Sequence, residues 1–157
     1  MHLEIDDLTR PQVIALLNEH RADMFELSPP DQVFALDVSK LKAPEITLWT
    51  AWAQGTLLGC GALKALSAVH GEIKSMRTPK NLRGQGAGRA ILAHIIETAT
   101  RRGYETLSLE TGTHPAFAPA QQLYQKFGFA YSGPFSDYAA NPHSVFMSLQ
   151  LAKHAKP

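Results

Sequence analysis

The stretch Arg83-Gly84-Gln85-Gly86-Ala87-Gly88-Arg89 decides how this sequence is interpreted. It lies between a predicted strand over residues 72–78 and a predicted helix over residues 89–102. Glycine has no Cβ, so the backbone turns tightly there and can come close to a ligand. The free N–H groups at a helix N-terminus carry partial positive charge and bind phosphate or pyrophosphate. The stretch therefore predicts an anion-binding loop, with Arg83 and Arg89 as charged flanks.

Two common nucleotide-binding motifs do not fit this loop. A P-loop has Lys and then Ser or Thr after its last Gly, whereas Gly88 is followed by Arg89 and Ala90. A dinucleotide-binding fingerprint that begins at Gly84 and Gly86 needs its third Gly at position 89. Binding of ATP through a P-loop and of NAD through a Rossmann loop are therefore excluded. A loop that is glycine-rich only for flexibility stays open as the alternative.

Length and composition predict one domain over residues 1–151, followed by a frayed tail over residues 152–157. The chain has 157 residues, of which 45% are hydrophobic, so it can bury a core. Its 15 Lys and Arg residues against 14 Asp and Glu residues give a net charge of +1. This charge provides no long-range attraction to nucleic acid or to an anionic membrane, so neither is an expected partner.

The single cysteine, Cys60, excludes an intramolecular disulfide and a cysteine-based metal cluster. It lies in an apolar strand, so we expect a buried residue and not a nucleophile. The seven His residues have no metal-ligand spacing, and we expect no metal. We find neither a signal peptide nor a membrane-spanning run, which predicts a cytoplasmic protein.

Periodicity predicts seven strands and four helices around the glycine loop. The apolar runs over residues 46–53 and 56–66, on either side of a Gln54-Gly55 turn, predict a hairpin. With the chain order, this hairpin predicts an α+β fold, in which helices cover both faces of a mixed, mostly antiparallel sheet of about seven strands. We expect Thr9 to cap the first helix and only one of Trp49 and Trp52, on opposite strand faces, to be in the core. The expected strands cover residues 3–5, 46–53, 56–66, 72–78, 106–110, 129–132 and 144–151, and the expected helices 9–27, 31–39, 89–102 and 119–127.

Two motifs resemble the Gcn5-related N-acetyltransferase (GNAT) family. Arg83, Gly86 and Gly88 match the family's loop after a strand and at a helix start. The run from Ala120 to Phe129 looks like a later helix of the family, with its Leu-Tyr pair and terminal Gly-Phe. The order of elements fits the family over nearly the whole chain. One departure is Phe117, where many members have an Asn that makes a local contact near the cofactor.

The resemblance implies the acyl-CoA N-acyltransferase fold and direct transfer of an acetyl group from acetyl-CoA to a primary amine of a small molecule or peptide. It also implies that the pyrophosphate binds the backbone amides of the glycine loop and that the pantetheine arm pairs with the backbone of the preceding strand. A non-catalytic module or sensor that only binds acyl-CoA is the alternative. The expected cofactor-binding residues are Met76, Arg77, Thr78, Arg83, Gly84, Gln85, Gly86, Ala87, Gly88 and Arg89.

Acyl transfer to an amine needs a base, a site for the oxyanion and an acid for the leaving thiolate. Glu72 is the candidate base and Glu110 the second choice. The alternative interpretation of Glu72 is a solvent-exposed carboxylate that forms an ion pair with Lys74 or Arg77 and has no part in the reaction. A main-chain N–H near Met76 or Arg77 is the expected oxyanion donor. By resemblance Tyr124 is the acid, and its alternative is an aromatic residue of the core.

The acceptor cannot be deduced from these motifs. We expect the loops over residues 25–34 and 134–143 to select it, because loops carry specificity. His70, Tyr138 and His143 are candidate lining residues of the acceptor site. Sheets of this kind also pair through their last strands, which makes a homodimer a further expectation.

Overall fold

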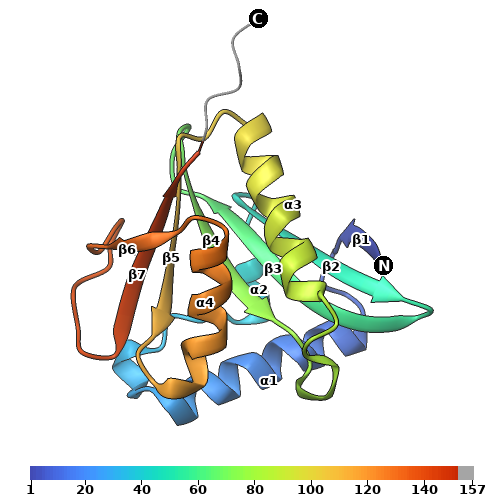
Figure 1. The fold of residues 1–157 in the computed structure, drawn as a ribbon. Helices are drawn as coiled ribbons and strands as arrows, with labels where there is room; N and C mark the ends of the chain where they lie inside the picture. Colours follow the sequence, from blue (N-terminus) through green and yellow to red (C-terminus); the bar gives the residue numbers. More distant parts are fainter. Residues whose placement is uncertain (152–157) are drawn as a thin grey trace, which may run out of the picture.

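A seven-stranded mixed sheet forms the centre of the protein (Figure 1). The computed structural model describes residues 1–151, so the predicted tail over residues 152–157 lies outside the described part. The strand order is β1-β2-β3-β4-β5-β7-β6, and every neighbouring pair is antiparallel except β4 and β5. The predicted fold class is confirmed. The strands are β1 (His2–Ile5), β2 (Ile46–Ala53), β3 (Thr56–Ala65), β4 (His70–Arg77), β5 (Thr106–Gly112), β6 (Ala130–Ser132) and β7 (Ser144–Gln150).

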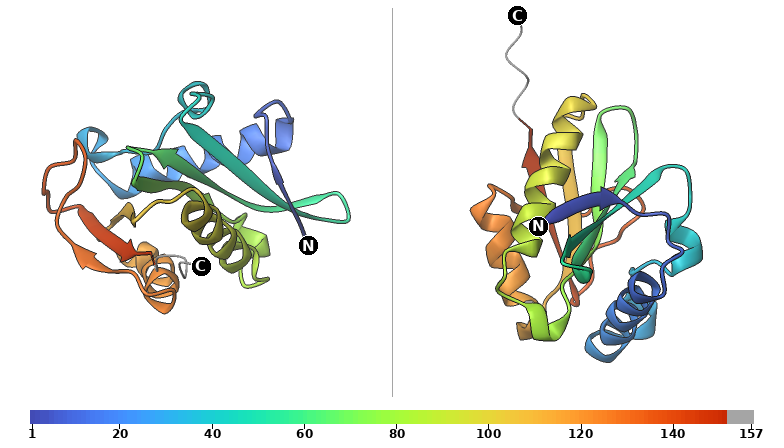
Figure 2. Two further views of the ribbon diagram at one scale, coloured as in Figure 1. Left: turned by 90° about the horizontal axis from the view of Figure 1, so that it is seen from above. Right: turned by 90° about the vertical axis from the view of Figure 1, so that its right-hand side faces the viewer.

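Helices cover both faces of the sheet, as Figure 2 shows. Side chains of α3 and α4 share one core cluster with the sheet, and side chains of α1 and α2 share a second cluster with its other face. Trp49 belongs to the first cluster and Trp52 to the second, so the expectation that only one of them is buried was wrong. Both faces of β2 are covered, which buries both rings. The α-helices are α1 (Pro11–Leu27), α2 (Val38–Leu41), α3 (Ala87–Arg101) and α4 (Ala118–Lys126), and the 3-10 helices are η1 (Pro30–Gln32), η2 (Lys80–Leu82) and η3 (Pro115–Phe117).

The start of α1 and the segment after it differ from the sequence prediction. Arg10 and not Thr9 precedes the first helical residue, because the Thr9 hydroxyl donates to Asp7. The helix expected over residues 31–39 is interrupted, and only η1 and the short α2 form. Asp37 adopts an extended backbone and its carboxylate accepts from the N–H of Lys40, so it starts a new helix. The intervening segment brings the ring of Phe34 against Tyr138, which lies between β6 and β7.

The parallel strands β4 and β5 are paired only over their first halves. The register joins His70–Ile73 to Thr106–Leu109 and does not continue beyond them. The pairing of β4 with β3 shifts its register between Lys74 and Arg77, and Ser75 in this stretch has φ +56°. Such a bulge bends a strand and leaves backbone groups unpaired. The second halves of β4 and β5 therefore separate and open a space within the sheet.

Candidate functional site

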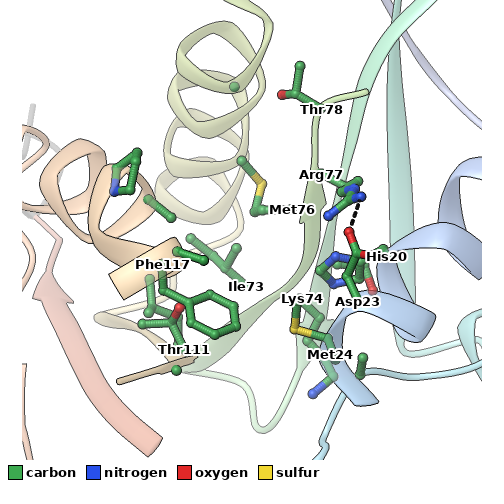
Figure 3. Close-up of a pocket in the computed structure, with 18 of the residues that line it drawn as sticks. His20, Asp23, Met24, Ile73, Lys74, Met76, Arg77, Thr78, Thr111 and Phe117 are labelled. Atoms are coloured by element: carbon green, nitrogen blue, oxygen red, sulfur yellow. Dashed lines mark hydrogen bonds and ion pairs between the residues drawn. The ribbon is translucent and has the colours of Figure 1, made fainter. Parts of the chain in front are cut away.

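A cavity of about 740 Å³ occupies the space where β4 and β5 separate (Figure 3). Its lining comes from parts of the chain that are far apart in sequence. The glycine loop and the start of α3 form one end, and β4, β5, α1 and α4 form the walls, with Asp23 of α1 beside Arg77 and Lys80. The segment after α1 and Tyr138 form the other end. The sequence-predicted loop, strand edge and catalytic candidates therefore meet in one cavity.

The glycine loop leads directly into α3. Gly84 and Gly86 have φ values of +83° and +85°, a conformation that side chains with a Cβ rarely adopt, and open space surrounds both positions. Helix α3 begins at Ala87, so the N–H groups of its first turn have no partner carbonyl one turn earlier. Arg83 and Arg89 line the same end of the cavity, whereas Gln85 is exposed and does not line it. Backbone amides, helix dipole and two guanidinium groups are thus available to an anion here.

The second half of β4 supplies the edge along which an extended ligand can pair. Met76, Arg77 and Thr78 all line the cavity, beyond the last residue of β4 that pairs with β5. Their side chains alternate, so Met76 packs against the α3 side of the sheet and Arg77 points to α1. On the side that faces β5, the backbone of this segment has no strand partner among the described residues, so an extended ligand could pair with it.

Glu72 lies deep in the cavity wall. Only 2% of the residue is exposed, so it is not a solvated strand carboxylate. Its Oε2 atom lies 3.1 Å from Nζ of Lys74 and accepts a 2.5 Å hydrogen bond from the hydroxyl of Tyr138. Of the two expected ion-pair partners of Glu72, Lys74 pairs with it and Arg77 does not. A buried carboxylate at the edge of a cavity is a candidate general base.

Arg77 ties β4 to α1 and so fixes one wall of the cavity. Its guanidinium lies 2.6 Å from Glu19 and 2.5 Å from Asp23, and its side chain is 7% exposed. His20 lies beside this cluster, where burial and the charge of Arg77 lower its pKa to about 4, so the imidazole is neutral at pH 7. The sequence did not predict this cluster, because Arg77 is 54 residues from Asp23 and 58 from Glu19.

Glu110 and Tyr124 line the middle of the cavity. Burial raises the pKa of Glu110, although the Ser144 hydroxyl donates a 2.8 Å hydrogen bond to it. Burial, and then the charge of Glu110, raise the pKa of Tyr124, which keeps the phenol protonated. Tyr124 is also packed against Phe129, with ring centroids 5.8 Å apart. The two interpretations of Tyr124 are therefore compatible, because it is a core residue that also borders the cavity.

Only one of the three candidate lining residues of the acceptor site borders the cavity. Tyr138 lines the cavity, while His70 and His143 do not. His70 lies 2.8 Å from the Ser108 hydroxyl on the neighbouring strand. Phe34, from the segment after α1, packs edge-to-face on Tyr138 at 5.0 Å between ring centroids. The two segments expected to select the acceptor therefore meet at this end of the cavity.

Three further features of residues 1–151 concern metal ligands, the length and apolarity of the helices, and Cys60. Residues 1–151 contain no cluster of three or more His, Cys, Asp or Glu side chains arranged to hold a metal ion. None of the described helices combines the length and apolarity needed to cross a bilayer. Cys60 is completely buried, which raises the pKa of its thiol to about 12 and keeps it unreactive.

Sequence comparisons find close relatives of this chain. The model of the acetyltransferase (GNAT) family matches residues 13–129. The chain is 54% identical over 151 residues to YsnE of Bacillus subtilis (strain 168), covering 96% of this chain and all of that protein. It is 47% identical over 152 residues to YedL of Escherichia coli (strain K12), covering 97% and 96% of the two chains. Both relatives are named as uncharacterized N-acetyltransferases.

Solved structures share the fold. A Klebsiella pneumoniae protein described as an acyl-CoA N-acyltransferase has a TM-score of 0.77 and 29% identity, with 96% of this chain and 97% of that chain covered. An aminoglycoside 6′-N-acetyltransferase complexed with coenzyme A has a TM-score of 0.73 and 14% identity, over 99% and 100% of the chains. A GNAT acetyltransferase of Elizabethkingia anophelis with acetyl-CoA bound has a TM-score of 0.68 and 18% identity, over 96% and 97%.

Proposed function

Because the chain belongs to the acetyltransferase (GNAT) family, we propose that it transfers the acetyl group of acetyl-CoA directly to a primary amine of a small molecule or peptide. One observation carries the proposal. A single cavity joins the glycine loop at the start of α3 to a buried carboxylate, Glu72, and a buried phenol, Tyr124. The same cavity thus offers an anion site and the two proton-transfer groups that the reaction needs.

The cofactor fits the chain's own groups at one end of the cavity. The backbone amides of residues 83–89 and the guanidinium groups of Arg83 and Arg89 would hold the pyrophosphate. The free backbone of Met76, Arg77 and Thr78 would pair with the amide groups of the pantetheine arm. Bound in this way, acetyl-CoA supplies an activated thioester. Two structural neighbours are described with coenzyme A or acetyl-CoA bound, which supports this choice.

In this proposal Glu72 accepts a proton from the amine and Tyr124 donates one to the thiolate. An alkyl ammonium has a pKa of about 10.4, so Glu72 takes a proton from the acceptor before nitrogen attacks the carbonyl carbon. Backbone N–H groups at the β4 bulge, near Met76 or Arg77, stabilise the oxyanion. When the tetrahedral intermediate collapses, the C–S bond breaks and Tyr124 gives its proton to the departing thiolate. The nitrogen loses its second proton as the amide forms, and that proton returns through water to the Tyr124 phenolate. Glu72 holds the proton taken from the amine until it passes to solvent.

The alternative, a module that binds acyl-CoA without chemistry, has less support. Both relatives above are named N-acetyltransferases, and the family match extends through Tyr124. A pure binding module has no need of a buried carboxylate facing the cavity, because burying a charge destabilises the fold. A cytoplasmic location and pairing of two copies through the last strands stay predictions.

The proposed function can be tested by measuring binding and thiol release separately. Acetyl-CoA at 100 times its Kd should stabilise the protein by about 2.7 kcal/mol, seen as a rise in Tm. A panel of amines, amino acids and short peptides should then give free CoA with at least one acceptor. Stabilisation without CoA release from any acceptor would support the binding module, and no stabilisation would overturn both hypotheses.

Tyr124→Phe tests the acid. The change removes one hydroxyl and keeps the ring packed on Phe129, so we expect kcat to fall by about 10²-fold and the Kd of acetyl-CoA to stay the same. Tyr104→Phe is the matched control, because Tyr104 is a buried tyrosine of the same core cluster that does not line the cavity. Unchanged turnover in Tyr124→Phe, measured with a thiol reagent, would remove it as the acid.

A further inference from the structure

Three polar side chains form a closed triangle at the acceptor end of the cavity. Nζ of Lys74 lies 3.1 Å from Oε2 of Glu72 and donates a 2.9 Å hydrogen bond to the hydroxyl of Tyr138. The hydroxyl of Tyr138 donates to the same Oε2 atom at 2.5 Å. All three residues line the cavity. Neither Lys74 nor Tyr138 has a part in the proton transfers described above.

The carboxylate of Glu72 is held in an unsymmetrical way. Oε2 accepts from both Lys74 and Tyr138, whereas no residue within the described range 1–151 donates a hydrogen bond to Oε1. A carboxylate without fixed partners rotates freely about its last C–C bond, because that torsion has a broad energy profile. Two donors on one oxygen stop this rotation. The unpartnered oxygen then has a defined position in the cavity wall.

The two donors come from different elements and are themselves fixed. The side chain of Lys74 is only 8% exposed. Tyr138 belongs to the segment between β6 and β7, and its ring packs on Phe34, Phe135 and Phe146 with centroids 5.0, 5.0 and 5.6 Å apart. Burial, and then the charge of Glu72, raise the pKa of Tyr138, so its hydroxyl remains a donor at neutral pH. The triangle therefore joins β4 to the segment between β6 and β7.

We propose that Lys74 and Tyr138 are positioning residues, which hold Glu72 through Oε2 so that Oε1 faces the acceptor amine. The inference rests on the proposed function, since it assigns Glu72 as the base. Its physical basis is that a base must be within hydrogen-bond reach of the proton it removes, and small misplacements reduce the rate strongly. Lys74 also compensates the buried negative charge, which is costly without a partner.

Tyr138→Phe and Lys74→Met test this inference. Tyr138→Phe removes one donor and keeps the ring packing, so we expect kcat to fall about tenfold with the KM for acetyl-CoA unchanged. Lys74→Met removes the other donor and its charge, and we expect a fall of about 10²-fold, in line with general-base effects. The controls are Tyr131→Phe and Lys126→Met, which alter exposed residues away from the cavity and should leave kcat unchanged. Turnover is measured with the best amine of the panel.

A double-mutant cycle separates positioning from a general structural role. Residues that act only through Glu72 lose their effect once its base function is gone. We therefore expect Tyr138→Phe to lower kcat about tenfold in the wild-type background and by less than twofold in Glu72→Gln. Equal losses in both backgrounds, or wild-type kcat in Tyr138→Phe, would overturn the inference. If Lys74→Met lowers the Tm, its lower kcat can come from partial unfolding, and the kcat of Tyr138→Phe then decides whether the inference holds. Absence of wild-type CoA release would instead overturn the proposed function and the inference together.

Discussion

Replacing Glu72 with Gln is expected to lower kcat by about 10²- to 10⁴-fold, the range typical of a lost general base. The amide oxygen of Gln can still accept from Lys74 and Tyr138, so the packing of the site is kept while the base is removed. The Kd of acetyl-CoA should not change, because the anion site is formed by the glycine loop at the other end of the cavity. Single-turnover kinetics and calorimetry measure the two quantities.

Glu110→Gln is the matched control for this change. Glu110 is the second carboxylate in the cavity, and it is partnered by Ser144 and not by Lys74. We expect a loss of less than tenfold in kcat. The opposite ranking, with Glu72→Gln active and Glu110→Gln inactive, would exchange their roles and would refute the assignment of Glu72.

Gly86→Val is expected to weaken acetyl-CoA binding about 100-fold or more. Gly86 has φ +85°, and a β-branched side chain is strained there, so the loop must rearrange and move its amides. Two lost hydrogen bonds to a charged group are worth about 3 kcal/mol, which corresponds to this loss in affinity. The rise in Tm produced by acetyl-CoA should disappear, while circular dichroism still shows the folded protein.

Gly55→Val controls for backbone strain in this experiment. Gly55 also has a positive φ, +78°, with open space around it, but it lies in the turn between β2 and β3 and does not line the cavity. Both variants should lose about 1–3 kcal/mol of stability, and only Gly86→Val should lose the cofactor. Normal acetyl-CoA affinity in Gly86→Val would refute the placement of the pyrophosphate.

The sequence was informative where neighbouring residues make the structure. The strand, glycine loop and helix around Gly86 are local, and their spacing predicted a tight turn before α3, which the structure has with Gly86 at φ +85°. The hairpin of β2 and β3 follows from two apolar runs around Gln54 and Gly55. The helix expected over residues 31–39 was wrong because Asp37 competes as a local cap, a choice that propensity alone does not settle.

The candidate site was only partly predictable because its polar contacts join distant segments. Glu72 and Tyr138 are 66 residues apart, and Arg77 is 58 residues from Glu19. No spacing rule connects such pairs. The sequence therefore indicated Lys74 only as an ion-pair partner of a Glu72 that has no part in the reaction.

The sequence by itself determined the order of the elements, the family and the glycine loop at the start of α3, because each depends on residues close together in the chain. Only the tertiary structure decided that Glu72 is buried, that one of its oxygens has two donors and that the acceptor end is bordered by Phe34 and Tyr138. The physical reason is the separation of β4 from β5. That separation opens the sheet at one place, which is lined by segments that are far apart in the chain.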